Sequence, residues 1–163
     1  MTFINQNYRI KTILHLENST EDAELILGIL NRSDMNFNIH LVSDRENFID
    51  SLKTLNPDII LSDLDIPGFD GFEALKIAGN LSSDTPFIFV TGAAGEEMAV
   101  TALKSGAKDF ILKKNLERLI PSVKRAIDER KIFAERKKLY QTLKEKEERY
   151  RTLVENLPVG VFR

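Results

Sequence analysis

A chain of 163 residues is long enough for one domain with an appendage, and its 42% hydrophobic and 29% charged residues are typical of globular proteins. The absence of cysteine excludes disulfides, thiolate metal sites and cysteine nucleophiles. No apolar run approaches the ~20 residues that a membrane-spanning helix needs, and the first eleven residues lack the apolar core of a signal peptide, so the sequence predicts a soluble, cytoplasmic protein with no membrane partner.

The net charge of −2 conceals an uneven distribution. Residues 124–151 contain eleven basic and six acidic side chains, a balance of +5, which leaves −7 for the rest of the chain. This division predicts an acidic globular part followed by a basic, helix-prone tail. Because acids alternate with bases in the tail, we expect no direct binding of nucleic acid.

Five short runs rich in Ile, Val, Leu and Phe are predicted to form strands at residues 12–16, 37–42, 58–62, 86–90 and 109–112. Helical patterns lie between and after them, at Thr20–Asn31, Arg45–Leu55, Gly71–Asn80, Glu96–Lys104 and from about Leu116 onward. This alternation predicts an α/β fold with a doubly wound parallel sheet. Periodicity does not reveal the order of the strands.

Functional groups of a doubly wound sheet gather outside the carboxyl ends of its strands. In this sequence those ends carry an acid, an amide, a second acid, a hydroxyl and an amine: Glu17, Asn18, Asp63, Thr91 and Lys113. The set provides a carboxylate nucleophile, oxygen ligands for a hard cation and two groups able to hold phosphate oxygens.

Four segments carry a resemblance to a known family: "ILHLENSTEDAEL", "PDIILSDLDIPGFDGFEAL", "FIFVTGAA" and "GAKDFILKK". In this order and spacing they resemble the receiver domain of two-component response regulators, over about residues 10–130. The resemblance implies a flavodoxin-like sheet with strand order 2-1-3-4-5. It also implies Mg²⁺ dependence and transfer of a phosphoryl group to an aspartate from a histidine kinase or a phosphotransfer protein.

By this resemblance, Asp63 in "SDLDIP" is the phosphoacceptor. Thr91 would hydrogen-bond a phosphoryl oxygen, and Lys113 would pair first with Asp63 and then with the phosphoryl group. Phe110 stands at the aromatic position whose rotamer follows phosphorylation in the family. Taken singly, each residue also has an ordinary explanation: a solvated acid in a turn, a strand-end threonine, a solvated lysine and a core phenylalanine.

The resemblance implies a Mg²⁺ site formed by Glu17, Asn18, Asp63 and the backbone carbonyl of Asp65. The family usually has two acids where this chain has "EN" at 17–18. Asn18 offers an amide oxygen but no charge, so the site loses one unit of attraction for the dication. Two alternatives therefore stay open: a phosphorylated receiver, or a degenerate receiver that acts as a dimerisation or docking module. A metal-dependent phosphatase is a third reading, which Asp65 supports by spacing only.

Other catalytic motifs find little support in the sequence. His15 and His40 both lie in predicted strands and are interpreted as core residues. Residues 114–163 contain no histidine, so this part of the tail carries no phosphodonor histidine of a kinase. The GxGxxG and GxxxxGK[ST] patterns are absent. We expect no turnover of a separate substrate beyond Mg²⁺-dependent self-phosphorylation and self-dephosphorylation.

The tail repeats apolar residues at intervals of three and four. Five of the seven positions in this series are apolar or aromatic: Ile132, Leu139, Leu143, Tyr150 and Leu153. The other two positions are occupied by Arg136 and Lys146. This spacing predicts a coiled-coil linker over residues 131–150 and a homodimer, whereas the alternative is a solvent-exposed helix that continues the last helix of the domain.

The segment "ERYRTLVENLPVGVFR" at the end of the sequence resembles the opening of a PAS sensor domain, which we assign to residues 151–163 and which is too short to fold alone. The resemblance implies a longer native protein in which a PAS module precedes a kinase or another output.

Overall fold

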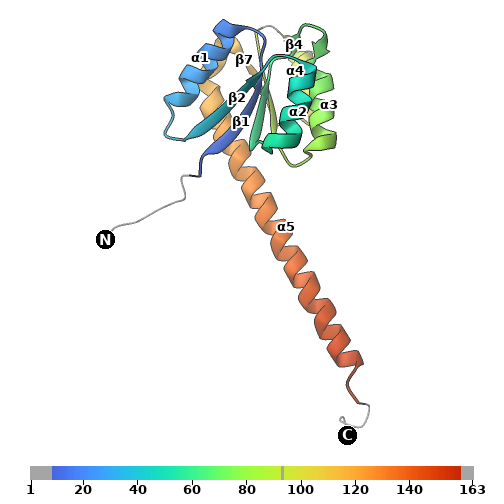
Figure 1. Cartoon of the computed structure of the whole chain (residues 1–163). Helices are drawn as coiled ribbons and strands as arrows, with labels where there is room; N and C mark the ends of the chain where they lie inside the picture. Colours follow the sequence, from blue (N-terminus) through green and yellow to red (C-terminus); the bar gives the residue numbers. More distant parts are fainter. Residues whose placement is uncertain (1–8, 93, 159–163) are drawn as a thin grey trace, which may run out of the picture. The chain divides into compact units, whose positions relative to one another are not determined.

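The computed structural model describes residues 9–92 and 94–158, which form a parallel five-stranded sheet with helices on both faces (Figure 1). The strands of this sheet are β1 (Lys11–Leu16), β2 (Phe37–Val42), β3 (Ile59–Ser62), β6 (Phe87–Thr91) and β7 (Asp109–Leu112). The helices are α1 (Thr20–Asn31), α2 (Arg45–Leu55), α3 (Gly71–Leu81), α4 (Glu96–Lys104), the 3₁₀ helix η1 (Lys113–Arg118) and α5 (Leu119–Glu155). The order β2-β1-β3-β6-β7 confirms the flavodoxin-like arrangement.

Each face of the sheet has its own hydrophobic core, because neighbouring side chains of a strand point to opposite faces. Ile13 joins the cluster beneath α1 and α5, whereas Leu14 joins the cluster beneath α2, α3 and α4. Figure 1 shows the same division of the helices between the two faces. The central strand β3 is buried along its whole length, as the apolar run predicts for a strand covered on both sides.

The two strand histidines have different environments. His15 in β1 is 2% exposed, which confirms the core interpretation for this residue. His40 is exposed, so the core interpretation was wrong for the second histidine. The reason is topological: β2 is an edge strand of the sheet, and it leaves Asn38, His40 and Leu41 open to solvent.

A short antiparallel hairpin that the sequence did not predict follows β3. It consists of β4 (Asp65–Ile66) and β5 (Phe69–Asp70), joined through Gly68 at a φ of 71°. The Asp70 carboxylate caps α3 by accepting a hydrogen bond from the amide of Phe72 at 2.9 Å. The "DIPGFDG" segment thus returns the chain sharply from the sheet edge into α3.

Helix α5 begins in the domain and continues well beyond it. Its buried side chains end at Ile127, and no side chain of residues 128–158 is buried. The chain accordingly divides into two compact units, 1–127 and 128–163. The coiled-coil positions Leu139 and Tyr150 are each 71% exposed. The helix also includes 151–155 of the segment interpreted as a PAS start, whereas 159–163 lie outside the described residues.

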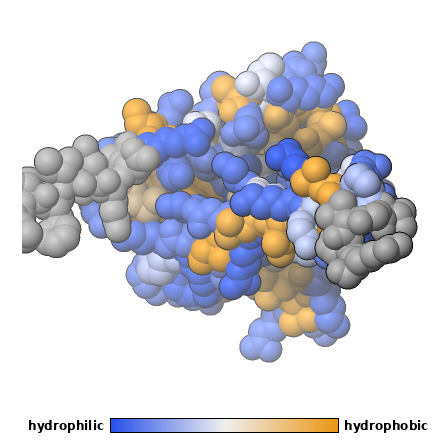
Figure 2. Space-filling model, turned by 90° about the horizontal axis from the view of Figure 1, so that it is seen from below, coloured by the Kyte–Doolittle hydropathy of each residue, from blue (hydrophilic) through white to orange (hydrophobic). Residues whose placement is uncertain are grey.

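The surface seen from below is mainly hydrophilic, with small apolar groups between polar ones (Figure 2). Among the helices in the part of the chain that the structure describes, none combines the length and apolar character needed to cross a bilayer.

Gly71, the first residue of α3, provides a test of the tight turn after β3. A Cβ at this position would lie 2.8 Å from Leu64 Cα and 2.9 Å from the carbonyl oxygens of Asp63 and Leu64, all backbone atoms. We expect Gly71→Ala to lower the free energy of unfolding by about 1–3 kcal/mol, because the backbone beside Asp63 must move. The matched control is Gly79→Ala in the same helix, where nothing lies within 4 Å of the added Cβ. That change should be neutral or stabilising by up to about 1 kcal/mol. Equal urea midpoints for the two variants would contradict the prediction.

Candidate functional site

The carboxyl ends of the strands bring the predicted site residues to one edge of the sheet. Leu16 pairs with Ser62 across β1 and β3, so the next residues, Glu17 and Asp63, emerge side by side. The amide of Asp63 donates to the carbonyl of Leu16 at 2.9 Å, which fixes this juxtaposition. Lys113 begins η1 directly after β7, and its side chain reaches both acids.

Lys113 is the centre of the site. Its ammonium donates to Glu17 Oε2 at 2.7 Å, to Asp22 Oδ2 at 2.7 Å and to Asp63 Oδ2 at 2.9 Å. Burial alone would lower the pKa of Lys113, but the hydrogen bonds from the three carboxylates outweigh it and raise the pKa above its ordinary value. The lysine is therefore a permanent cation at the mouth of the sheet.

Glu17 is held beneath this ammonium with its side chain fully buried. Burial raises the pKa of Glu17, while the hydrogen bonds from Lys113 and from the amide of Ser19 lower it. The net direction is upward, because a carboxylate withdrawn from water loses more solvation than these donors return. A second cation near Glu17 would favour its ionised form further.

The two carboxylate oxygens of Asp63 have different partners. Oδ1 accepts from the amide of Leu64 at 2.6 Å and, more weakly, from the amide of Asp65 at 3.4 Å. Oδ2 accepts from Lys113. The carboxylate is thus oriented by the turn on one side and by the ammonium on the other. Asp65 contributes its backbone amide to this arrangement, and its side chain is exposed to solvent.

Thr91 and Phe110 are both buried near this edge. Thr91 ends β6 and pairs with Leu112, the residue before Lys113. It is 1% exposed, and its hydroxyl oxygen has no hydrogen-bond partner among the described residues. A buried hydroxyl without a partner costs about 1–3 kcal/mol, a cost that a bound oxygen ligand would remove. The Phe110 ring lies 5.9 Å from the ring of Phe89, within the core under α2, α3 and α4.

His15 lies in β1 two residues before Glu17. Burial and, to a smaller extent, the positive charge of Lys113 lower the pKa of His15 to about 4, although Asp63 acts in the opposite direction. The imidazole is therefore neutral at pH 7 and adds no positive charge beneath the carboxylates.

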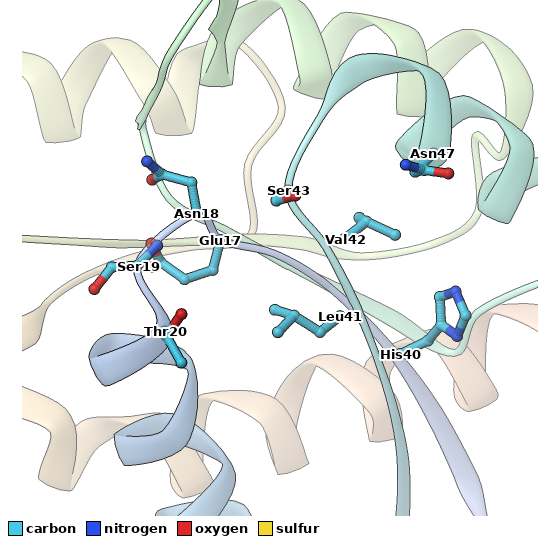
Figure 3. Close-up of a pocket in the computed structure, with 9 residues that line it drawn as sticks. All are labelled: Glu17, Asn18, Ser19, Thr20, His40, Leu41, Val42, Ser43 and Asn47. Atoms are coloured by element: carbon cyan, nitrogen blue, oxygen red, sulfur yellow. The ribbon is translucent and has the colours of Figure 1, made fainter.

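Asn18 lies beside Glu17 in the wall of a pocket of about 470 Å³. Residues from the β1–α1 segment and from the β2–α2 segment lie on two sides of it (Figure 3). Its polar lining is completed by Ser19, Ser43 and Asn47, among others. Asn18 thus lies directly after the end of β1, next to Glu17, which is one of the three acids that contact Lys113.

The donor set can be tested for its fit to Mg²⁺. Within the described ranges, no three His, Cys, Asp or Glu side chains form a ready-made metal group. The carboxylates of Glu17 and Asp63 instead contact the Lys113 ammonium. Mg²⁺ does not need a full protein cage, since it usually binds one or two carboxylates together with waters and phosphate oxygens. Two carboxylates, an amide oxygen and a nearby backbone carbonyl therefore fit this ion chemically.

Sequence reasoning missed two acids: Asp22 at the site, and Asp109 at the opposite end of β7 from Lys113. Asp22 was not among the predicted site residues, yet its carboxylate contacts Lys113, which is 91 residues away in the chain. Asp109, at the start of β7, is 8% exposed. Its carboxylate accepts from Arg118 and Arg125 at 3.1 Å and from the hydroxyl of Ser122 at 2.5 Å. The sequence signal for Asp22 was an acid four residues, about one helical turn, after Asn18. For Asp109 the signal was the series of Arg118, Ser122 and Arg125, spaced by four and three residues across η1 and α5.

Comparisons with known proteins agree on this part of the chain. The family model described as "Response regulator receiver domain" matches residues 13–124. Among curated proteins, the C4-dicarboxylate transport transcriptional regulatory protein DctD of Pseudomonas aeruginosa is 34% identical over 99 residues, which are 60% of this chain and 21% of that protein. The regulatory protein LuxO of Vibrio cholerae is 33% identical over 113 residues, 69% of this chain and 24% of that protein. The chain thus spans about a quarter or less of these relatives.

Solved structures show the same similarity. The signal receiver domain of a putative LuxO repressor protein from Vibrio parahaemolyticus has a TM-score of 0.70 at 25% identity, over 77% of this chain and 95% of that one. A CheY-like response regulator receiver domain protein from Methanospirillum hungatei has a TM-score of 0.65 at 27% identity, over 75% of this chain and 97% of that one.

Proposed function

The chain belongs to the response regulator receiver domain family, and we propose that it accepts a phosphoryl group on Asp63 from a histidine kinase or a phosphotransfer protein. The observation that supports this most directly is the position of the Asp63 carboxylate, which is held by Lys113 and by turn amides at the open edge of the sheet. The buried Thr91 hydroxyl without a partner lies at the end of the adjacent strand.

In the proposed reaction, a carboxylate oxygen of Asp63 forms a bond to phosphorus as the phosphorus–nitrogen bond of a phosphohistidine breaks. The departing imidazole nitrogen keeps the electron pair and takes up a proton. Asp63 needs no general base, because an ionised carboxylate is already a nucleophile. The protein therefore acts by position and charge, as is usual for phosphoryl transfer.

Lys113 and Thr91 hold the phosphoryl group in this proposal. The ammonium now bound to Asp63 Oδ2 pairs with a phosphoryl oxygen, and the Thr91 hydroxyl donates to another. Receiver domains of this family generally use Mg²⁺, which offsets the negative charge of the phosphoryl oxygens when bound. In this chain Glu17, Asn18, Asp63 and the backbone carbonyl of Asp65 would hold it.

The phosphorylation site can be identified by mass spectrometry after incubation with acetyl phosphate and Mg²⁺. The wild-type chain should gain one phosphoryl group, and Asp63→Asn should gain none while keeping its far-ultraviolet circular dichroism. The control is Asp65→Asn, an exposed acid two residues later, which should still be modified. An unmodified wild-type chain would favour the alternative that the neutral Asn18 suggests, a degenerate receiver serving as a dimerisation or docking module.

We further propose that β7 relays the state of the site to α5. The strand begins at Asp109, carries Phe110 in the core and ends beside Lys113. Asp109 holds η1 and α5 through its contacts with Arg118, Ser122 and Arg125. A shift of Lys113 on phosphorylation would therefore move a strand whose first residue is bonded to the output helix.

Asp109→Asn tests this relay. The variant keeps the shape of the side chain but removes the charge that binds both arginines. With a beryllofluoride adduct on Asp63, we expect the change in amide hydrogen exchange over residues 119–127 to fall at least about twofold, since a neutral hydrogen bond is roughly half as strong as a charge-assisted one. Adduct formation itself should remain. Asp128→Asn, an exposed acid on the same helix, is the control, and equal responses in both variants would rule out the Asp109 route.

We propose that the second part of α5 pairs with the same helix of another copy. Its apolar seam is exposed, at 49% for Ile132, 64% for Leu143 and 63% for Leu153. In a parallel, in-register pair, each of the two charged seam positions lies beside an acid of the partner helix: Arg136 beside Glu135, and Lys146 beside Glu147. These charge pairs between the two helices would reduce the free-energy cost of placing Arg136 and Lys146 in an apolar seam.

Light scattering tests the pairing. Ending the chain at Arg130 should give a smaller assembly than the full chain, and Leu143→Glu should do the same because it places a charge in the seam. Lys144→Glu introduces the same acid one residue later, outside the seam, and should leave the assembly intact. Monomers in all four proteins at high concentration would instead show that the seam is a solvated helix face.

We propose that a PAS module follows α5 and receives the signal from it. The resemblance of residues 148–163 to a PAS opening supports a PAS module as the receiver of the signal. The curated relatives DctD and LuxO are named as regulatory proteins, the first as a transcriptional one. The absence of direct nucleic acid binding by this chain stays a prediction.

A further inference from the structure

The neutral Asn18 leaves the proposed Mg²⁺ site one negative charge short of the family pattern. A dication bound by oxygen ligands depends on the charge that surrounds it. Another acid close to the site would offset this loss of attraction for the dication. The following inference rests on the proposed phosphorylation of Asp63.

Asp22 is the acid in a position to compensate. Its Oδ2 lies 2.7 Å from Lys113 Nζ, the same distance as Glu17 Oε2 and shorter than the 2.9 Å to Asp63 Oδ2. The backbone is fixed there, because the amide of Asp22 donates to Ser19 Oγ at the N-cap of α1. Its side chain is 37% exposed, so it faces both the site and solvent.

The charges around Lys113 show what Asp22 restores. Glu17, Asp22 and Asp63 contribute three carboxylates to one ammonium, which leaves two negative charges when all are ionised. A receiver with aspartate at position 18 and no acid at position 22 would have the same balance. We propose that Asp22 is a functional residue of the phosphorylation site, where it supplies the carboxylate charge for a divalent cation that the amide of Asn18 lacks.

An acid in the first turn of a helix also has a simpler role, because it interacts favourably with the helix dipole. Glu21 and Asp22 both lie in the first turn of α1 and share that role. Of these two, Asp22 contacts Lys113. Glu21 is exposed, and its neutralisation is therefore a matched control for the loss of one helix-turn charge.

Isothermal titration of the full chain with Mg²⁺ measures the role of Asp22 without any phosphoryl donor. We expect Asp22→Asn to bind Mg²⁺ about threefold to tenfold more weakly, the range for removing one partly exposed charge near a dication. Glu21→Gln should change the affinity less than about twofold, because a solvent-exposed charge is screened. Adding Asn18→Asp to Asp22→Asn should restore wild-type affinity. Thermal melts without metal verify that each variant folds.

The outcomes separate this inference from the proposed function. If Asp22→Asn binds Mg²⁺ as tightly as Glu21→Gln does, Asp22 acts only through the helix, and the inference is overturned while phosphorylation of Asp63 can stand. Failure of Asn18→Asp to rescue Asp22→Asn would also overturn it, because the two charges would not be interchangeable. A wild-type chain that binds no Mg²⁺ at millimolar concentration overturns the metal site itself, and with it this role of Asp22.

Discussion

The ammonium of Lys113 is the countercharge on which the edge of the sheet depends. Glu17 and Asp63 are almost fully buried, and a buried carboxylate without a cation or donors would be strongly destabilising. The lysine reaches them only because the parallel strand order places β1, β3, β6 and β7 side by side with their carboxyl ends together. The α/β fold and the charged site are therefore parts of one arrangement: the topology concentrates the acids, and one lysine neutralises part of their charge.

This concentration of charge gives Lys113 three partners at once. In the proposed reaction, the lysine would exchange one or more of them when a metal or a phosphoryl group binds. Strand β7 connects such an exchange to both cores, since Phe110 belongs to the cluster under α2, α3 and α4 and Ile111 to the cluster under α1 and α5. Asp109 adds a polar contact from the same strand to α5. In the proposed relay, these contacts would change the environment of the last helix without a large rearrangement of the sheet.

Helix α5 serves two environments along its length. Up to Ile127 it covers a face of the sheet, and beyond that residue its apolar side chains have no partner among the described residues. A long isolated helix gains little stability from helix propensity alone, which supports the proposed pairing with the same helix of a second copy. Arg136 and Lys146 interrupt this apolar seam, so we expect the proposed pairing to be of moderate strength.

The sequence by itself determined the elements of the fold. The helices Thr20–Asn31 and Arg45–Leu55 begin and end where predicted, because Ser19 and Asp44 cap them and the apolar periodicity stops at their ends. The strand ends likewise pointed to Glu17, Asp63 and Lys113, since the carboxyl ends of parallel strands share one edge. Their roles in phosphorylation remain predictions.

Only the tertiary structure decided which faces are exposed and which distant charges meet. His40 lies in a run that looks like a core strand, but the edge position of β2 exposes it, and strand order is not encoded in periodicity. Asp22 looked like an ordinary helix-turn acid until the fold brought Lys113 within 2.7 Å of it. Local patterns report which side of an element is apolar, whereas a contact across 91 residues depends on the crossovers that pack α1 beside the end of β7.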